Sequence, residues 1–146
     1  MVLRLTGMKV AGLLLLISAS TCPLAAPALL TFAPTTPTTL TLQGSDIVTV
    51  SYVVTNQAAR TTSWTMKPIL GVVQLTGAAG ECASPFVLGQ NQSCALDLRL
   101  SATQMNDATK VGPIACESSS PLSCYQPSAA NQLDVMVWIF ADGFGP

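Results

Sequence analysis

The stretch "SCALDLRLS" at residues 93–101 alternates between apolar and polar side chains. This period of two places Leu96, Leu98 and Leu100 on one face, as in a half-buried β-strand. Such a strand must pair with other strands and bury its leucine face, so it indicates a fold built from sheets. Cys94 stands at the start of this predicted strand, where a disulfide would tie the strand to a neighbouring loop.

The same pattern recurs along the chain between breaks rich in Pro, Gly and Asn. It is clearest in "DIVTVSYVVTN", where one face of the predicted strand carries Val48, Val50, Tyr52 and Val54. Further predicted strands lie within residues 30–43, 61–66, 72–77, 86–88 and 131–140. No window outside the N-terminal segment shows a helical period over about twelve residues. Roughly six to eight short strands predict an all-β, antiparallel β-sandwich.

Residues 1–28 are expected to be a signal peptide. Arg4 and Lys9 give a positively charged start, residues 10–17 form a short apolar run, and small residues at 26–28 suit cleavage. A buried core helix is the alternative interpretation of this run. The apolar run is far shorter than the roughly 20 apolar residues of a membrane span, so we expect no transmembrane span. The predicted signal places the protein in the periplasm or outside the cell.

The rest of the chain predicts one domain, residues 29–140, followed by a flexible tail, residues 141–146. Charged residues make up 9% of the chain, whereas about 25% is usual in globular proteins. Without Arg4 and Lys9, four basic residues remain against seven acidic ones. Binding to nucleic acid needs a clustered basic face, so this charge balance argues against a nucleic-acid partner.

Five cysteines are present, and four of them follow the predicted signal peptide. Four cysteines in an exported domain imply two disulfides, for which three connectivities are possible. The spacing favours Cys82–Cys94 and Cys116–Cys124, because each pair brackets a short loop of small and polar residues. Residues 114–128 are accordingly expected to form a loop. Zinc is the alternative, but zinc sites favour closer cysteine pairs or histidine, and the chain has no histidine.

Cys22 follows the apolar run within "ASTC", close to where bacterial lipoproteins carry their lipid-modified cysteine. The match is incomplete, since the residue three positions earlier is Ala19 instead of leucine. If the signal is cleaved after Ala26 or Ala28, Cys22 leaves with it. If Cys22 is lipidated instead, acyl chains anchor the protein to the envelope.

Residues able to carry catalysis form no recognisable pattern. The lack of histidine excludes Ser-His-Asp and Cys-His arrangements. The acidic residues are scattered over predicted turns and outward strand positions, and no phosphate loop, dinucleotide fingerprint or calcium loop is present. We therefore expect no enzyme activity, no cofactor and no metal site. A hydrolase would need a pocket in which carboxylates converge.

Several blocks of the sequence together carry a family resemblance. They are "LTFAPTTPTTLTL", "VSYVVTNQAAR", "MKPILGVVQ", "CASPFVLGQNQSCALDLRLS", "GPIAC" and "CYQPSAANQLDV", which run in order from about Leu30 to Val135. With the four cysteines, they resemble small exported Ig-like domains of intracellular bacterial pathogens, a family of unassigned biochemical function. The resemblance implies an Ig-like sandwich, which family members often carry ahead of a larger domain as a spacer or docking unit. The end, "MVWIFADGFGP", is more apolar than the family pattern.

The last predicted strand is apolar on both faces. The face expected to point into the core carries Leu133, Val135, Val137 and Ile139. Met136, Trp138 and Phe140 then face outward and form a candidate partner surface. Because the last strand of an Ig-like sandwich often lies near a sheet edge, it could also accept another chain by strand addition, including a second copy. The alternative is that Trp138 packs on the segment after the signal peptide or begins a disordered tail.

These features predict a secreted, disulfide-stapled Ig-like domain. We expect it to act as a non-catalytic interaction or structural module with a protein or cell-surface partner. One alternative is a carbohydrate-binding module of the cell envelope that uses Trp64 or Trp138 as a stacking platform, although we expect Trp64 to lie in the core. Another is an envelope protein anchored by lipid at Cys22.

Overall fold

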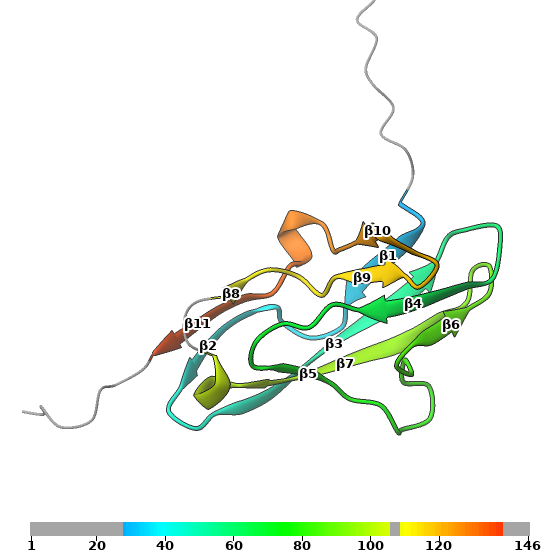
Figure 1. The fold of residues 1–146 in the computed structure, drawn as a ribbon. Coiled ribbons are helices and arrows are strands. Elements are labelled where there is room, and N and C mark those ends of the chain that lie inside the picture. Colours follow the sequence, from blue (N-terminus) through cyan, green and yellow to red (C-terminus); the bar gives the residue numbers. More distant parts are fainter. Residues whose placement is uncertain (1–27, 106–108, 139–146) are drawn as a thin grey trace, which may run out of the picture.

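The computed structural model describes residues 28–105 and 109–138, which form β-strands and two short 3-10 turns (Figure 1). In chain order the strands are β1 (Leu30–Pro34), β2 (Thr39–Gln43), β3 (Ile47–Asn56), β4 (Thr62–Met66), β5 (Val72–Gln74), β6 (Phe86–Leu88), β7 (Ser93–Ser101), β8 (Thr109–Lys110), β9 (Ala115–Glu117), β10 (Ser120–Tyr125) and β11 (Asp134–Trp138). The turns are η1 (Ala102–Gln104) and η2 (Ala129–Asn131). The predicted all-β class is confirmed for these residues.

Several predictions concern residues outside this range. The signal peptide predicted for residues 1–28 lies outside it except for Ala28, so Cys22 is also outside. The tail predicted for residues 141–146 and the side chain of Phe140 lie outside it as well. The structure therefore bears on the domain predicted for residues 29–140 over most of its length.

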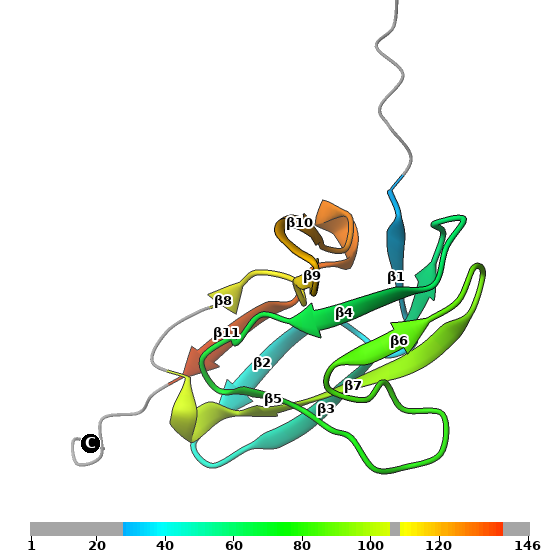
Figure 2. The same cartoon turned by 45° about the vertical axis from the view of Figure 1, so that its right-hand side comes forward.

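The strands form two layers around one core (Figures 1 and 2). One layer is a sheet in the order β1-β3-β7-β5, and its centre is the long antiparallel pair of β3 and β7. The other layer holds a four-stranded sheet, β10-β9-β4-β6, and a three-stranded sheet, β2-β11-β8. This arrangement supports the predicted sandwich.

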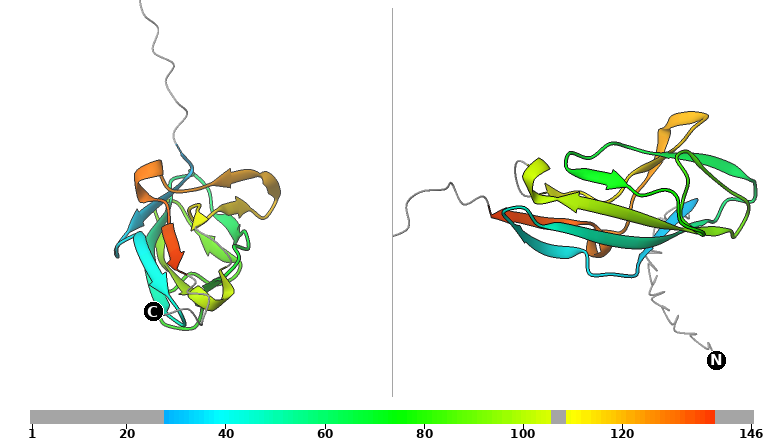
Figure 3. Two further views of the ribbon diagram at one scale, coloured as in Figure 1. Left: turned by 90° about the vertical axis from the view of Figure 1, so that its left-hand side faces the viewer. Right: turned by 90° about the horizontal axis from the view of Figure 1, so that it is seen from below.

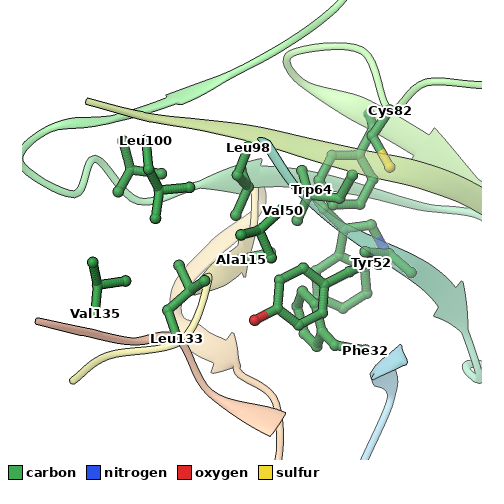
Figure 4. Close-up of a cluster of buried hydrophobic side chains, with 14 of the residues drawn as sticks. Phe32, Val50, Tyr52, Trp64, Cys82, Leu98, Leu100, Ala115, Leu133 and Val135 are labelled. Carbon is green, nitrogen blue, oxygen red and sulfur yellow. The ribbon is translucent and has the colours of Figure 1, made fainter. Parts of the chain in front are cut away.

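The core forms where the two layers face each other. Leu98 and Leu100 of β7 point toward Leu133 and Val135 at the opposite layer (Figure 4). All four side chains are fully buried. The alternation predicted for β7 is therefore confirmed, as is that of β3, whose Val50, Tyr52 and Val54 are also fully buried. The period of two in the sequence correctly assigned the faces of both central strands.

Tyr52 ties the core to the segment that leads into β11. Its ring meets that of Phe32 edge to face, with ring centroids 6.5 Å apart. Its hydroxyl donates a hydrogen bond to the carbonyl oxygen of Asn131 at 3.0 Å, in turn η2. Burial raises the pKa of Tyr52 to about 12, because the low-dielectric surroundings disfavour the phenolate.

One pair of the named strands departs from the predicted antiparallel pattern. β2 and β11 pair in parallel, from Thr39 opposite Asp134 to Gln43 opposite Trp138. The chain leaves the first sheet after Pro34, whose missing N–H suits the end of an edge strand. It then crosses to the other layer and pairs with β11. A parallel pair of this kind joins distant segments, which the sequence pattern of either strand alone does not reveal.

Two further predictions are wrong in part. Residues 114–128 were expected to form a loop, but β9 and β10 form a hairpin there, in which Cys116 and Cys124 face each other across the two strands. β11 was expected near a sheet edge, but it lies between β2 and β8 at Asp134 and Val135. β9 is stabilised by pairing with β4, and β11 by pairing with β2. Both partners are distant in sequence, so local patterns did not reveal these pairings.

Both predicted disulfides are confirmed. The Cα atoms are 5.0 Å apart in Cys82–Cys94 and 4.0 Å apart in Cys116–Cys124. Cys94 is the second residue of β7 instead of the first. Two backbone hydrogen bonds flank the first disulfide, from Cys82 N to Ala95 O at 2.7 Å and from Ala95 N to Gly80 O at 2.8 Å. The first disulfide therefore fixes the loop before β6 onto the start of β7, as the sequence predicted.

Candidate interaction surface on strands β2 and β11

β11 exposes two large apolar side chains on its outer face. Met136 is 52% exposed and Trp138 is 51% exposed. On the opposite face Val135 is fully buried and Val137 packs partly against the core. The predicted assignment of the two faces is therefore confirmed for these residues. Phe140, the third member of the predicted surface, lies outside the described residues.

β2 extends this face on one side. In the parallel register Met136 lies opposite Thr41, and Trp138 lies opposite Gln43. Thr41 and Gln43 are both exposed, and residues in register on paired strands direct their side chains to the same face. We call these four residues the β2–β11 surface. It combines two apolar side chains with a hydroxyl and an amide that can hydrogen bond to a ligand.

The two ends of the β2–β11 surface are polar and locally fixed. At one end the carboxylate of Asp46 accepts a hydrogen bond from the Gln43 backbone N–H at 2.9 Å, which holds the turn after β2. At the other end Lys110 Nζ lies 3.1 Å from Asp134 Oδ2. Both partners of this ion pair are well exposed, so it adds little stability. An apolar centre with a polar rim is the usual composition of a protein–protein contact area.

Existing strand pairs block the addition of another chain to much of β11. β2 pairs with all five of its residues, and β8 occupies the other side of Asp134 and Val135. The prediction of an open edge is wrong there, because β2 crosses between the layers to cover one side of β11. The β2–β11 surface is therefore a sheet face, which a partner would contact through side chains.

Trp64 is a core residue, as expected. It is fully buried and meets the ring of Tyr125 edge to face, with centroids 5.5 Å apart. Its Nε1 has no hydrogen-bond partner within the described part of the chain. A buried ring cannot serve as a platform for a sugar, so of the two tryptophans considered for carbohydrate binding only Trp138 is exposed.

Two buried polar residues were missed by sequence reasoning. Glu117 accepts hydrogen bonds from Arg60 at 2.7 Å and Ser119 at 2.9 Å. Asn56 is fully buried, and its amide nitrogen donates to the carbonyl oxygens of Leu88 at 2.8 Å and Arg60 at 2.9 Å. Both side chains join segments far apart in sequence, so no local pattern marks them. Both residues have a structural role, because buried polar groups require hydrogen-bond partners and these residues have them.

Two of the pockets formed by described residues are large enough to consider as sites, and neither gathers acidic side chains. One of about 280 Å³ lies beside β4 and β9, with Thr65, Lys67 and Glu117 in its lining. The other, about 320 Å³, lies beside β1, next to Phe32 and Pro127. Among the lining residues of both, Glu117 is the one carboxylate, and it already binds Arg60. The paired carboxylates that a hydrolase needs do not converge in either pocket.

Within residues 28–105 and 109–138, no group of three or more histidine, cysteine or acidic side chains is placed to hold a metal ion. No helix in the same part of the chain is long and apolar enough to cross a membrane. The sequence matches no protein-family model, and no curated protein matches it.

Proposed function

We propose that this protein is an exported, disulfide-stapled Ig-like domain that acts as a non-catalytic interaction module. Its partner is a protein or a cell-surface component that binds the β2–β11 surface. One observation carries the proposal: Met136 and Trp138 lie side by side, each about half exposed, on a strand whose other face packs against the core through Val135 and Val137. Tryptophan and methionine are enriched at protein interfaces, and tryptophan often dominates the binding energy.

The strand order supports the Ig-like part of the proposal. Immunoglobulin-type sandwiches place strands A, B, E and D in one sheet and C, F and G in the other. With β1 and β2 as two halves of strand A, the order β1-β3-β7-β5 corresponds to A-B-E-D. β4, then β9 with β8, and β11 correspond to C, F and G, and the buried Trp64 stands on strand C. Neither disulfide joins strands B and F, as it would in antibody domains.

The two disulfides support export. Disulfides form and persist in oxidising compartments such as the periplasm and the extracellular space. This agrees with the signal peptide predicted for residues 1–28. A lipid anchor at Cys22 would keep the same domain at the membrane surface, with the β2–β11 surface available to partners in the envelope.

The partner would bind side chains that a rigid pair of strands holds in place. Val135 is fixed in the core and β2 pairs along the strand, so Met136 and Trp138 lose little backbone freedom when a partner binds. Burying the two side chains removes apolar surface from water, while Thr41 and Gln43 satisfy polar groups at the margin. The same face could also meet its counterpart on a second copy.

Substitution of Trp138 tests the proposal. The full chain, Trp138→Ser and the control Leu70→Ser are compared, because Leu70 is a well-exposed apolar residue outside the surface. Self-association is measured by sedimentation over a concentration series, and partner capture is measured from culture fluid and cell envelopes. We expect Trp138→Ser to lose the association or the captured partner, by about 30-fold or more in affinity, and Leu70→Ser to retain it. Equal behaviour of all three proteins would contradict the proposal.

Carbohydrate binding at Trp138 is a second candidate, favoured by the polar side chains of Thr41 and Gln43 beside the ring. Sugars stack on exposed aromatic faces and hydrogen bond to neighbouring polar groups. Titration with envelope oligosaccharides should then change the tryptophan fluorescence of the native chain but not that of Trp138→Ser. Trp64 is fully buried and serves as an internal reference. An unchanged spectrum in the native chain would exclude this candidate.

A further inference from the structure

The hairpin of β9 and β10 carries an exposed bulge. Ser120 lies opposite Glu117, but the next paired residue of β10 is Cys124, opposite Cys116. The register therefore skips the three residues between Ser120 and Cys124, which are Pro121, Leu122 and Ser123. Leu122 is 95% exposed, more than any other large apolar residue in the described part of the chain. The hairpin projects from the body of the domain (Figure 3).

Covalent and hydrogen bonds hold the bulge at both ends. The Cys116–Cys124 disulfide closes it, and the hydroxyls of Ser120 and Ser123 lie 3.0 Å apart across its base. The turn of the hairpin is also attached to the sheet, because Ser118 N donates to the carbonyl oxygen of Ser63 at 2.9 Å. An apolar side chain fully exposed on a braced loop gains nothing for folding, and its loop loses little entropy when it binds.

The backbone of the bulge is suited to a protease cleft. Residues Ser120–Tyr125 are extended, and β10 is the outer strand of its sheet. An outer strand presents unpaired N–H and C=O groups to another chain. Serine proteases bind peptides in extended form by such backbone hydrogen bonds. They select the residue before the cleaved bond with a pocket, which is an apolar slot in chymotrypsin-like enzymes.

We propose that this hairpin is an inhibitory loop for a serine protease with an apolar specificity pocket. Leu122 enters the pocket, and the Leu122–Ser123 peptide bond lies at the catalytic serine of the protease. Pro121 restricts the backbone before Leu122, since its ring fixes φ. The inference rests on the hairpin alone and is independent of the β2–β11 surface.

The disulfide explains why such a loop would inhibit the protease instead of serving as a substrate. The serine Oγ of the protease adds to the carbonyl carbon of Leu122, the C–N bond to Ser123 breaks, and the protease histidine gives its proton to the leaving nitrogen. Both new ends lie within the loop closed by Cys116 and Cys124. The Ser123 amine is thus retained, and it can attack the acyl ester, re-form the peptide bond and return the serine hydroxyl. A high effective concentration favours this reversal over hydrolysis.

Inhibition assays with chymotrypsin and trypsin test the proposal. The full chain with both disulfides formed should inhibit chymotrypsin and leave trypsin, whose pocket carries an acidic group, unaffected. Leu122→Lys should weaken chymotrypsin inhibition by at least about 30-fold and create trypsin inhibition. Leu122 is exposed, so this variant should fold, and Leu70→Lys is the matched control that should leave inhibition unchanged.

Mass analysis under non-reducing conditions distinguishes the outcomes. An inhibitory loop gives mostly intact protein, with a minor form heavier by one water whose chain separates at Leu122–Ser123 only after reduction. The double variant Cys116→Ser, Cys124→Ser should instead be cleaved and lose inhibition. The proposal is overturned if the native chain does not inhibit chymotrypsin, if it is consumed rapidly at this bond, or if Leu122→Lys does not change the specificity.

Discussion

The two disulfides close loops of similar length but lie in different surroundings. Cys82 belongs to the core cluster and Cys94 packs against that cluster, and flanking backbone hydrogen bonds fix their loop to the central strand β7. Cys116 is also buried but lies outside the core cluster. Cys116–Cys124 lies within a single hairpin and closes an exposed bulge that presents Leu122. The first disulfide adds to the core, and the second shapes a displayed loop. Loop length alone therefore does not tell what a disulfide does.

The largest expected effect is the loss of the core-linked disulfide. The double variant Cys82→Ala, Cys94→Ala should lower the free energy of unfolding by about 3–5 kcal/mol, because it releases the loop and leaves space beside a buried residue. Chemical unfolding followed by fluorescence measures this loss. A loss no larger than the one measured for the hairpin disulfide would remove the distinction between the two disulfides.

A smaller loss is expected for the hairpin disulfide. The double variant Cys116→Ala, Cys124→Ala should cost about 2 kcal/mol, since the chain-entropy effect is similar but fewer core contacts depend on this bond. The same unfolding measurement applies. The comparison is sharpened by mild reduction followed by thiol labelling and mass analysis, in which Cys124 should be labelled before Cys82. The reverse order would contradict the assignment of Cys82 to the core cluster and of Cys124 to the half-buried end of the hairpin.

Tyr52 provides a pH test of the core region. Its pKa is raised to about 12 by burial, so the folded chain keeps the phenol proton at pH values where the unfolded chain has lost it. Its contribution is complete below pH 10.0 and is lost as the pH rises toward 12. Tyr52→Phe should remove this alkaline dependence and cost about 1 kcal/mol at neutral pH, through loss of the hydrogen bond to Asn131. Denaturant midpoints measured between neutral pH and pH 11 test both expectations.

The smallest effect is expected at Leu122. Leu122→Ser should change the free energy of unfolding by less than about 0.5 kcal/mol, because the side chain is 95% exposed. Thermal unfolding of the two proteins under identical conditions is sufficient. A loss of about 2 kcal/mol would show that Leu122 stabilises the fold, which would contradict its assignment as an exposed side chain available to a partner.

Sequence reasoning was most successful where the signal is local. The alternation of Leu96, Leu98 and Leu100 assigned the buried face of β7, and Trp64 was correctly expected in the core. Both disulfide pairs were found from spacing, since each closes a short loop. For the candidate site, alternation also assigned Met136 and Trp138 to the exposed face of β11.

The errors arose where a segment depends on a distant partner. β9 has three residues, too few for a clear period, and it is a strand because Thr65 and Trp64 of β4 pair with it. The buried contacts of Asn56 and Glu117 likewise join residues that are remote in sequence. Such contacts depend on how the strands are ordered, which alternation does not specify.

The sequence by itself determined the all-β class, the inward and outward faces of the long strands, and the two cysteine pairs. These follow from periods of two and from short loops, which need no knowledge of distant residues. Tertiary structure alone decided that β2 pairs in parallel with β11, which makes a sheet face out of an expected edge. It also decided that Pro121, Leu122 and Ser123 bulge outward from a hairpin. The physical reason is that strand order and register minimise exposed apolar surface and unpaired backbone groups over the whole chain at once.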